Sequence, residues 1–222
     1  MKRYGTRAEV WHGTARMTKG RLTKKDFIKN RHGRIVSRIK SLKHSKNDDK
    51  NPLKKIIKKS KKIGIRTKCY ISVAFYCPFE GKVDKGYVSE LVNQIIDFGI
   101  DEIVIADTIG QANPMEVKLL FRDLLNMNKS DMFSAHFHDT RALGLANVFA
   151  SLDQGVKKFD SSIGGLGGCP FAPGSSGNLA TEDLVSMLEM MNITTGVNLD
   201  KLISSRELAS EFTRISLKGR MI

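Results

Sequence analysis

Between residues 52 and 212, short apolar runs alternate with longer segments whose apolar residues recur every three or four positions. The first pattern predicts buried strands, and the second predicts amphipathic helices. A strand and a helix that alternate four times, at spacings of about 30 residues, are typical of parallel β/α construction. The sequence therefore predicts an α/β fold with a parallel sheet.

The expected elements can be placed by residue number. Four strands are predicted at 68–74, 103–106, 132–136 and 159–162. Helices are predicted at 52–63, 87–98, 115–127, 142–152, 180–191 and 199–212. Gly64 and Gly99 suit the ends of the first two helices, and Pro114 suits the start of the third.

Polar residues stand at the ends of the predicted strands. Asp107, the pair His136 and His138, and Asp160 each end or follow a strand, where β/α folds place their sites, and we expect all of them on one face of the sheet. Because His136 and His138 are two residues apart, they point to the same side of an extended chain and could bind one metal ion. The alternatives are a hydrogen-bonded histidine pair without metal, and an Asp107 that only closes a turn.

A glycine-rich segment follows the last predicted strand. Six glycines fall between 164 and 177, and such a loop suits a mobile lid that carries Cys169 as an acid or base. The alternative is a flexible connector with an incidental thiol. Asn178 opens the next helix, where its amide oxygen is a candidate ligand for Mg²⁺ or Mn²⁺ or a simple helix cap.

Charge divides the chain unevenly. The net charge is +14, but residues 1–68 hold 24 Lys and Arg against 4 Asp and Glu, and residues 69–222 hold 13 against 19. We therefore expect a basic, largely irregular arm over 1–50 and a folded domain over 51–222. Such an arm would neutralise phosphates and bind nucleic acid without sequence preference, or it is only a disordered, solvated tail.

Several classes of protein are disfavoured. The longest nearly apolar run, residues 69–77, is far shorter than the ~20 residues of a membrane span, so no membrane partner is expected. Three cysteines without a C-x-x-C pair indicate a reducing compartment. The basic N-terminus is rich in Lys and has no Ser before Ser37, unlike a transit peptide, so we expect a cytoplasmic protein and leave a mitochondrial location open.

Five motifs in the body resemble the 3-hydroxy-3-methylglutaryl-CoA lyase family. They lie at 70–82, 107–110, 136–140, 160–171 and 176–183, and the segment with Cys169 is the most specific. The resemblance implies a TIM barrel of eight β/α units, of which this chain would form the second half, with four units. It also implies Mg²⁺ or Mn²⁺, an acyl-CoA substrate, and retro-Claisen cleavage of hydroxymethylglutaryl-CoA to acetyl-CoA and acetoacetate.

The same resemblance implies roles for individual residues. It makes His136, His138 and Asn178 metal ligands, with His136 also counted among the catalytic residues. It makes Asp107 a carboxylate that faces the substrate, and Cys169 the lid residue that transfers a proton.

The chain also departs from the family. A whole barrel takes about 250 residues, but the resemblance covers residues 52–212 only. In the family the first strand carries an Arg-Asp pair, which stabilises the enolate and completes the metal site, and the second strand carries a Glu. No such pair stands before residue 52, and Arg122-Asp123 falls inside a predicted helix.

Three hypotheses follow from this departure. The first is that the chain is a lyase that is active only if the missing half comes from elsewhere. A homodimer is possible, since two copies would give the eight strands of a barrel, but we expect ill-defined association rather than proper closure. Alternatively the chain is an inactive half-barrel fused to a nucleic-acid-binding arm, or the product of a truncated or chimeric gene. Residues 4–15, 22–26 and 32–37 also resemble a short basic module of large DNA virus proteins, which implies that the arm contacts nucleic acid.

Overall fold

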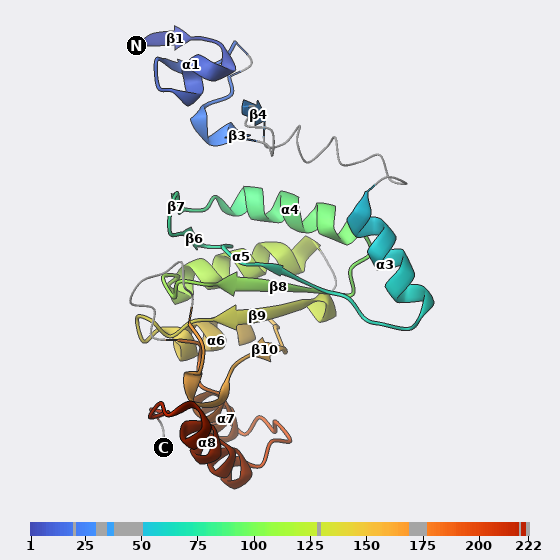
Figure 1. Ribbon diagram of the computed structural model, residues 1–222, viewed down its shortest axis with the longest axis vertical. Coiled ribbons are helices and arrows are strands. Elements are labelled where there is room, and N and C mark those ends of the chain that lie inside the picture. The colour runs from blue at the N-terminus through green and yellow to red at the C-terminus, as the bar shows by residue number, and fades with distance from the viewer. Residues whose placement is uncertain are drawn as a thin grey trace. The chain divides into compact units, whose positions relative to one another are not determined.

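A computed structural model describes residues 1–19, 21–29, 35–37, 51–127, 130–168, 177–217 and 219–220. The chain divides into two compact units, Met1–Ile63 and Gly64–Ile222 (Figure 1). The domain boundary that the charge distribution predicts, at residue 50, stays a prediction because residues 38–50 lie outside the described part.

The larger unit is built on a four-stranded parallel sheet. Its strands are β5 (Lys68–Ile71), β8 (Glu102–Asp107), β9 (Phe133–Phe137) and β10 (Phe159–Asp160). Each strand lies beside the next of the four along the chain, in the order β10-β9-β8-β5, and every pair is parallel. All four predicted strands are therefore present, and the α/β prediction is confirmed.

Helices alternate with these strands as the periodicity predicts (Figure 1). They are α4 (Lys85–Asp97), α5 (Pro114–Met127), α6 (Gly144–Leu152), α7 (Thr181–Met190) and α8 (Leu199–Thr213). A short hairpin of β6 (Tyr76–Cys77) and β7 (Gly81–Lys82), and the 3₁₀ turns η3 (Ser130–Met132) and η4 (Ile163–Gly165), were not predicted. None of the helices within the described residues is long and apolar enough to cross a membrane.

The strand register assigns side chains to the two faces of the sheet. Ile103 pairs with Phe133 and Ile105 with Ala135, and all four are at most 1% exposed. The opposite face carries polar residues, because Lys68 pairs with Glu102 and His136 pairs with Asp160.

The sheet is also strongly curved. The side chains of Lys68 and Tyr70, on β5, both reach Asp160 on β10, at 2.8 Å each. In a flat sheet these strands would lie about 14 Å apart, three strand spacings. Such curvature is what a partial barrel requires, with the polar face on its inner side.

The N-terminal unit corrects the prediction of a largely irregular arm. Strand β1 (Lys2–Tyr4) pairs in parallel with β2 (Ala15–Met17), and helix α1 (Arg7–Trp11) lies between them in sequence. The turn η1 (Lys24–Asp26) leads into β3 (Phe27–Lys29), which pairs with β4 (Ile35–Ser37), and α3 (Pro52–Lys62) follows.

This unit has a small core of its own. Val10, Ala15 and Phe27 are at most 3% exposed, and Trp11, Leu22 and Ile35 pack against them. Strands of three residues are too short to display a period of two, so pattern analysis could not detect them.

Candidate active site

The two histidines of the predicted site lie together at the carboxyl end of β9. Their ring centroids are 5.2 Å apart, with the rings tilted by 58°. The Nδ1 atoms of both rings are buried, and neither has a hydrogen-bond partner in the described part of the chain. Burial, and to a smaller extent the neighbouring His136, lower the pKa of His138 to about 4, so this imidazole is neutral at pH 7.

Asn178 lies next to this pair. It forms an isolated antiparallel bridge with His138, although 40 residues separate them in the sequence. Its amide nitrogen donates to the carbonyl oxygen of Leu166, at 3.0 Å, which leaves its own carbonyl oxygen as a candidate ligand. The structure therefore brings the three predicted metal ligands to one end of the sheet.

The donor set fits a divalent cation in part. Imidazole nitrogens that are buried and have no hydrogen-bond partner among the described residues suit a transition metal such as Mn²⁺ better than Mg²⁺, which prefers oxygen ligands. Among the described residues, however, no group of three or more His, Cys, Asp and Glu side chains could hold a metal ion. A carboxylate ligand for the cation would therefore have to come from outside the described residues of this chain.

Asp107 was expected on the face of the histidines, and this expectation is wrong. The register pairs Ala106, not Asp107, with His136, and alternation then places Asp107 on the opposite face. Its carboxylate is buried and accepts hydrogen bonds from the backbone N–H groups of Gln111 and Ala112, at 3.0 and 2.8 Å. Burial raises the pKa of Asp107 despite these bonds. Its predicted contact with substrate stays a prediction, and the geometry favours the turn-closing alternative.

Cys169 lies outside the described residues, so its predicted role stays a prediction. The start of its loop is held firmly by α7. The carboxylate of Glu182 is fully buried and accepts the N–H of Gly164 with both oxygens, at 2.9 and 3.0 Å. Gly164, with φ +55°, takes a left-handed conformation that glycine adopts without strain.

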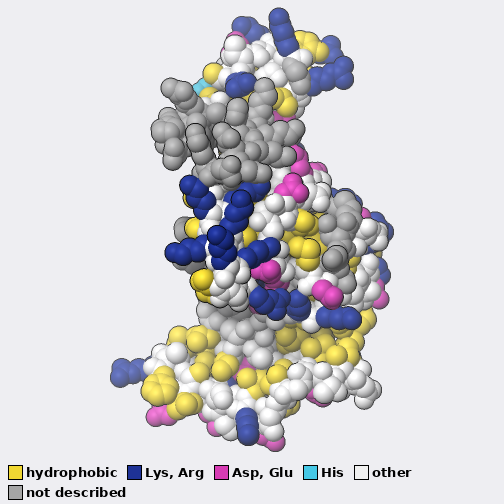
Figure 2. Space-filling model, turned by 90° about the vertical axis from the view of Figure 1, so that its right-hand side faces the viewer, with side chains coloured by type: hydrophobic (Ala, Val, Ile, Leu, Met, Phe, Trp, Pro, Cys, Tyr) yellow, Lys and Arg dark blue, Asp and Glu magenta, His cyan; other side chains and the backbone are white. Residues whose placement is uncertain are grey.

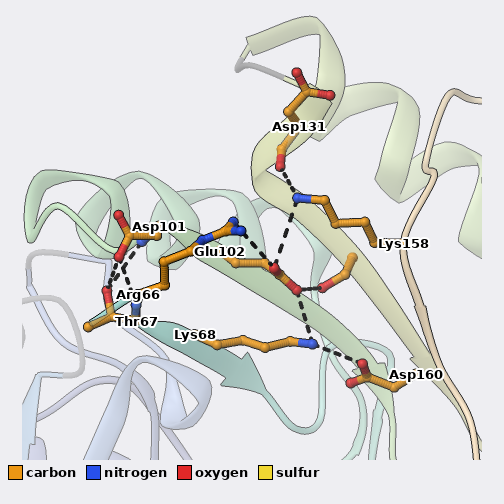
Figure 3. Close-up of polar contacts among 9 residues, drawn as sticks. Arg66, Thr67, Lys68, Asp101, Glu102, Asp131, Lys158 and Asp160 are labelled. Carbon is orange, nitrogen blue, oxygen red and sulfur yellow. Dashed lines mark hydrogen bonds and ion pairs between the residues drawn. The ribbon is translucent and has the colours of Figure 1, made fainter. Parts of the chain in front are cut away.

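A network of charged side chains on the sheet was not predicted (Figure 3). Lys68 bridges two carboxylates, with its Nζ 3.0 Å from Glu102 and 2.8 Å from Asp160. Glu102 also accepts the hydroxyl of Ser134 at 2.8 Å. The spacing of Lys68 and Tyr70, two residues apart in a strand, was the signal that both extend from one face.

Asp160 connects this network to the histidines. Its Oδ2 accepts the hydroxyl of Tyr70 and lies 3.6 Å from Nδ1 of His136. Although burial opposes ionisation, the contacts with His136, Lys68 and Tyr70 hold the pKa of Asp160 well below its ordinary value. Asp160 is therefore a carboxylate at neutral pH, and it lies within ion-pair distance of Nδ1 of His136, which has no hydrogen-bond partner among the described residues.

Comparison with known proteins shows which family the chain belongs to. The family model described as HMGL-like matches residues 33–209. The chain belongs to this family. It is 43% identical over 172 residues to the hydroxymethylglutaryl-CoA lyase YngG of Bacillus subtilis, covering 78% of this chain and 58% of the relative. It is 41% identical over 140 residues to (R)-citramalyl-CoA lyase of Chloroflexus aurantiacus, covering 63% and 44%.

Solved structures of the family share the fold. The Bacillus subtilis HMG-CoA lyase superposes with a TM-score of 0.74 at 42% identity, over 83% of this chain and 59% of the other. An HMG-CoA lyase from Acinetobacter baumannii, in complex with coenzyme A and 3-methylmalate, gives 0.73 at 35% identity, over 84% and 58%. The chain thus spans about half the length of the curated relatives it matches, as expected for a partial barrel. Arg122 and Asp123 lie inside α5, as the sequence predicts.

Proposed function

We propose that this chain supplies one half of a hydroxymethylglutaryl-CoA lyase site. The observation that carries the proposal is the convergence of His136, His138 and Asn178 at one end of a curved parallel sheet. The substrate is a branched 3-hydroxyacyl-CoA, and the reaction is its retro-Claisen cleavage to acetyl-CoA and acetoacetate.

His136, His138 and Asn178 would hold Mn²⁺ or Mg²⁺. A bound cation would polarise the substrate's oxygen atoms and make its hydroxyl more acidic. In the cleavage a base takes the hydroxyl proton, the hydroxyl-bearing carbon becomes the ketone of acetoacetate as the carbon–carbon bond breaks, and the electron pair left on the acetyl-CoA fragment takes up a proton. Cys169, which follows in the sequence the Gly164 turn that Glu182 binds, would supply that proton.

The other half of the site has to come from outside the matched segment. The family's Arg, the group that stabilises the developing enolate, has no counterpart in this chain, and one such stabiliser contributes on the order of 10²–10³ in rate. The chain alone is therefore expected to have little lyase activity.

The test compares the chain alone with the chain mixed with the first half of the Bacillus subtilis relative, in an assay for acetoacetate with Mn²⁺. Activity that appears only in the mixture, and that Cys169→Ser in this chain abolishes, is the expected result. Ordinary turnover by the chain alone would refute the half-site. No turnover in the mixture would favour the second candidate, an inactive half-barrel.

Substrate choice needs a separate comparison, because one similar relative is a citramalyl-CoA lyase. Hydroxymethylglutaryl-CoA and citramalyl-CoA offered to the same mixture would rank the two substrates. The relatives from Bos taurus and Homo sapiens are among those that are mitochondrial by name. Cell fractionation would test the cytoplasmic location that we propose for this chain.

A further inference from the structure

The N-terminal unit holds a basic surface that plays no part in the lyase chemistry. Residues 1–29 contain nine Lys and Arg and two acids. The structure describes the side chains of eight of these nine cations, and all eight are exposed. They are Lys2, Arg3, Arg7, Arg16, Lys19, Arg21, Lys24 and Lys25. We call these eight side chains the basic surface. The end of the chain that Figure 1 labels β1 lies at the top of Figure 2, where many Lys and Arg side chains are visible.

Both acids are already committed to the fold. Glu9 accepts the backbone N–H of Thr6 at 2.8 Å, and Thr6 in turn caps the N–H of Glu9, at 3.2 Å. Asp26 accepts the backbone N–H of Thr23 at 2.7 Å. These reciprocal contacts are capping boxes, which hold the first turns of α1 and η1.

Most of these cations are consequently left without an acidic partner among the described residues. Among the described residues, Lys2 alone of the eight has an ion pair, at 3.1 Å from Glu9. Like charges this dense repel one another and oppose a compact state unless counterions or a polyanion neutralise them. A tail that served only to solvate the chain would need neither a core of Val10, Ala15 and Phe27 nor two capping boxes.

We propose that the basic surface binds nucleic acid through its phosphates. Charge complementarity selects a polyanion, and the phosphate backbone carries the charge density that releases condensed counterions when lysines and arginines replace them. An anionic membrane is disfavoured as the partner, because α1 has five residues and its Val10 is buried, so it offers no apolar face to insert. Tyr4, which is 45% exposed beside Arg3, is available to stack on a base.

The test is fluorescence anisotropy of the full chain with a labelled 30-base-pair DNA duplex over a salt series. The variant replaces three members of the basic surface that have no capping role, Arg7→Gln, Arg16→Gln and Lys25→Gln. Each lost phosphate contact lowers the slope of log K against log salt by about 0.9, so a loss of about 2–3 in slope is expected. The fluorescence of Trp11, which packs on the small core, checks that the variant is folded.

A matched control neutralises three exposed cations of the other unit, Arg122→Gln, Lys157→Gln and Lys201→Gln. It should leave the slope close to that of the wild type. An equal loss in both variants would overturn the proposal, since binding would then follow net charge alone. Undetectable binding at 50 mM salt, or tighter binding to vesicles of anionic lipid than to the duplex, would overturn it as well.

Discussion

At the scale of single residues, Asp107 is the clearest case of a polar side chain that serves the fold. Its carboxylate accepts two buried backbone N–H groups, from Gln111 and Ala112. Asp107→Ala leaves both donors unsatisfied and should lower the free energy of unfolding by about 1–3 kcal/mol, whereas Asp107→Asn keeps one acceptor and should cost less. Urea denaturation measures the difference. A stable Ala variant would instead favour a role for Asp107 at the substrate.

The residues of the site could be predicted only in part. His136 and His138 were recognisable because two histidines at a spacing of two must share a side of a strand. The position of Asp107 at a strand end did not give its face correctly, since the relative register of two strands decides which residue faces which. Register depends on tertiary pairing, and nothing in one strand's sequence states it. The contact between Asp160 and Tyr70 could not be predicted either, because it depends on the curvature of the whole sheet.

Glu9 links the stability of the N-terminal unit to pH. The backbone N–H of Thr6, with help from Lys2, lowers the pKa of Glu9 from 4.5 to about 2. A carboxyl whose pKa is lower in the folded state stabilises that state above its unfolded pKa and loses this effect on protonation. The unit should therefore lose stability as the pH falls from about 4.5 to about 2.

Trp11 is the single tryptophan of the chain and packs on the core of this unit, so its fluorescence reports the transition. Glu9→Gln should remove that part of the pH dependence, while Glu207→Gln, at an exposed position of α8, should not. Acid profiles that coincide for wild type and Glu9→Gln would rule out the proposed linkage.

At the scale of elements, α7 fixes the start of the glycine-rich loop through Glu182. Glu182→Ala leaves the N–H of Gly164 without its acceptor, at a cost of about 1–3 kcal/mol. We expect amide exchange at Gly164 to accelerate about tenfold or more, with a smaller effect for Glu182→Gln. Hydrogen exchange followed by mass spectrometry measures this. Unchanged exchange in the Ala variant would show that Glu182 does not hold the loop.

Long elements were predictable and short ones were not. All the helices of the larger unit were expected, because nine or more residues at a period of 3.6 leave a clear pattern. The hairpin Tyr76–Cys77 with Gly81–Lys82 has two residues in each strand, too few for any pattern. The fold of the N-terminal unit was not predicted for the same reason. Its few apolar core residues are also scattered among many lysines and arginines, so they form no recognisable pattern.

At the scale of the whole molecule, the sheet has two edges. Within the described residues β5 and β10 each pair with a single neighbouring strand, and such edges recruit other strands. The net charge of +14 opposes association at low salt, and salt screens that repulsion. Light scattering over a salt series should therefore show dimers or larger species as salt rises. A monodisperse monomer at every salt concentration would mean that both edges are covered.

The most direct test of the half-site is calorimetric titration of the full chain with Mn²⁺. Wild type should bind, and His138→Ala should bind about tenfold more weakly or worse. His12→Ala, an exposed histidine of the other unit, serves as the control and should match wild type. Because the pKa of His138 is about 4, its protonation should compete with the metal only as the pH approaches that value. Identical curves for wild type and His138→Ala would contradict the metal site on which the proposed lyase function rests.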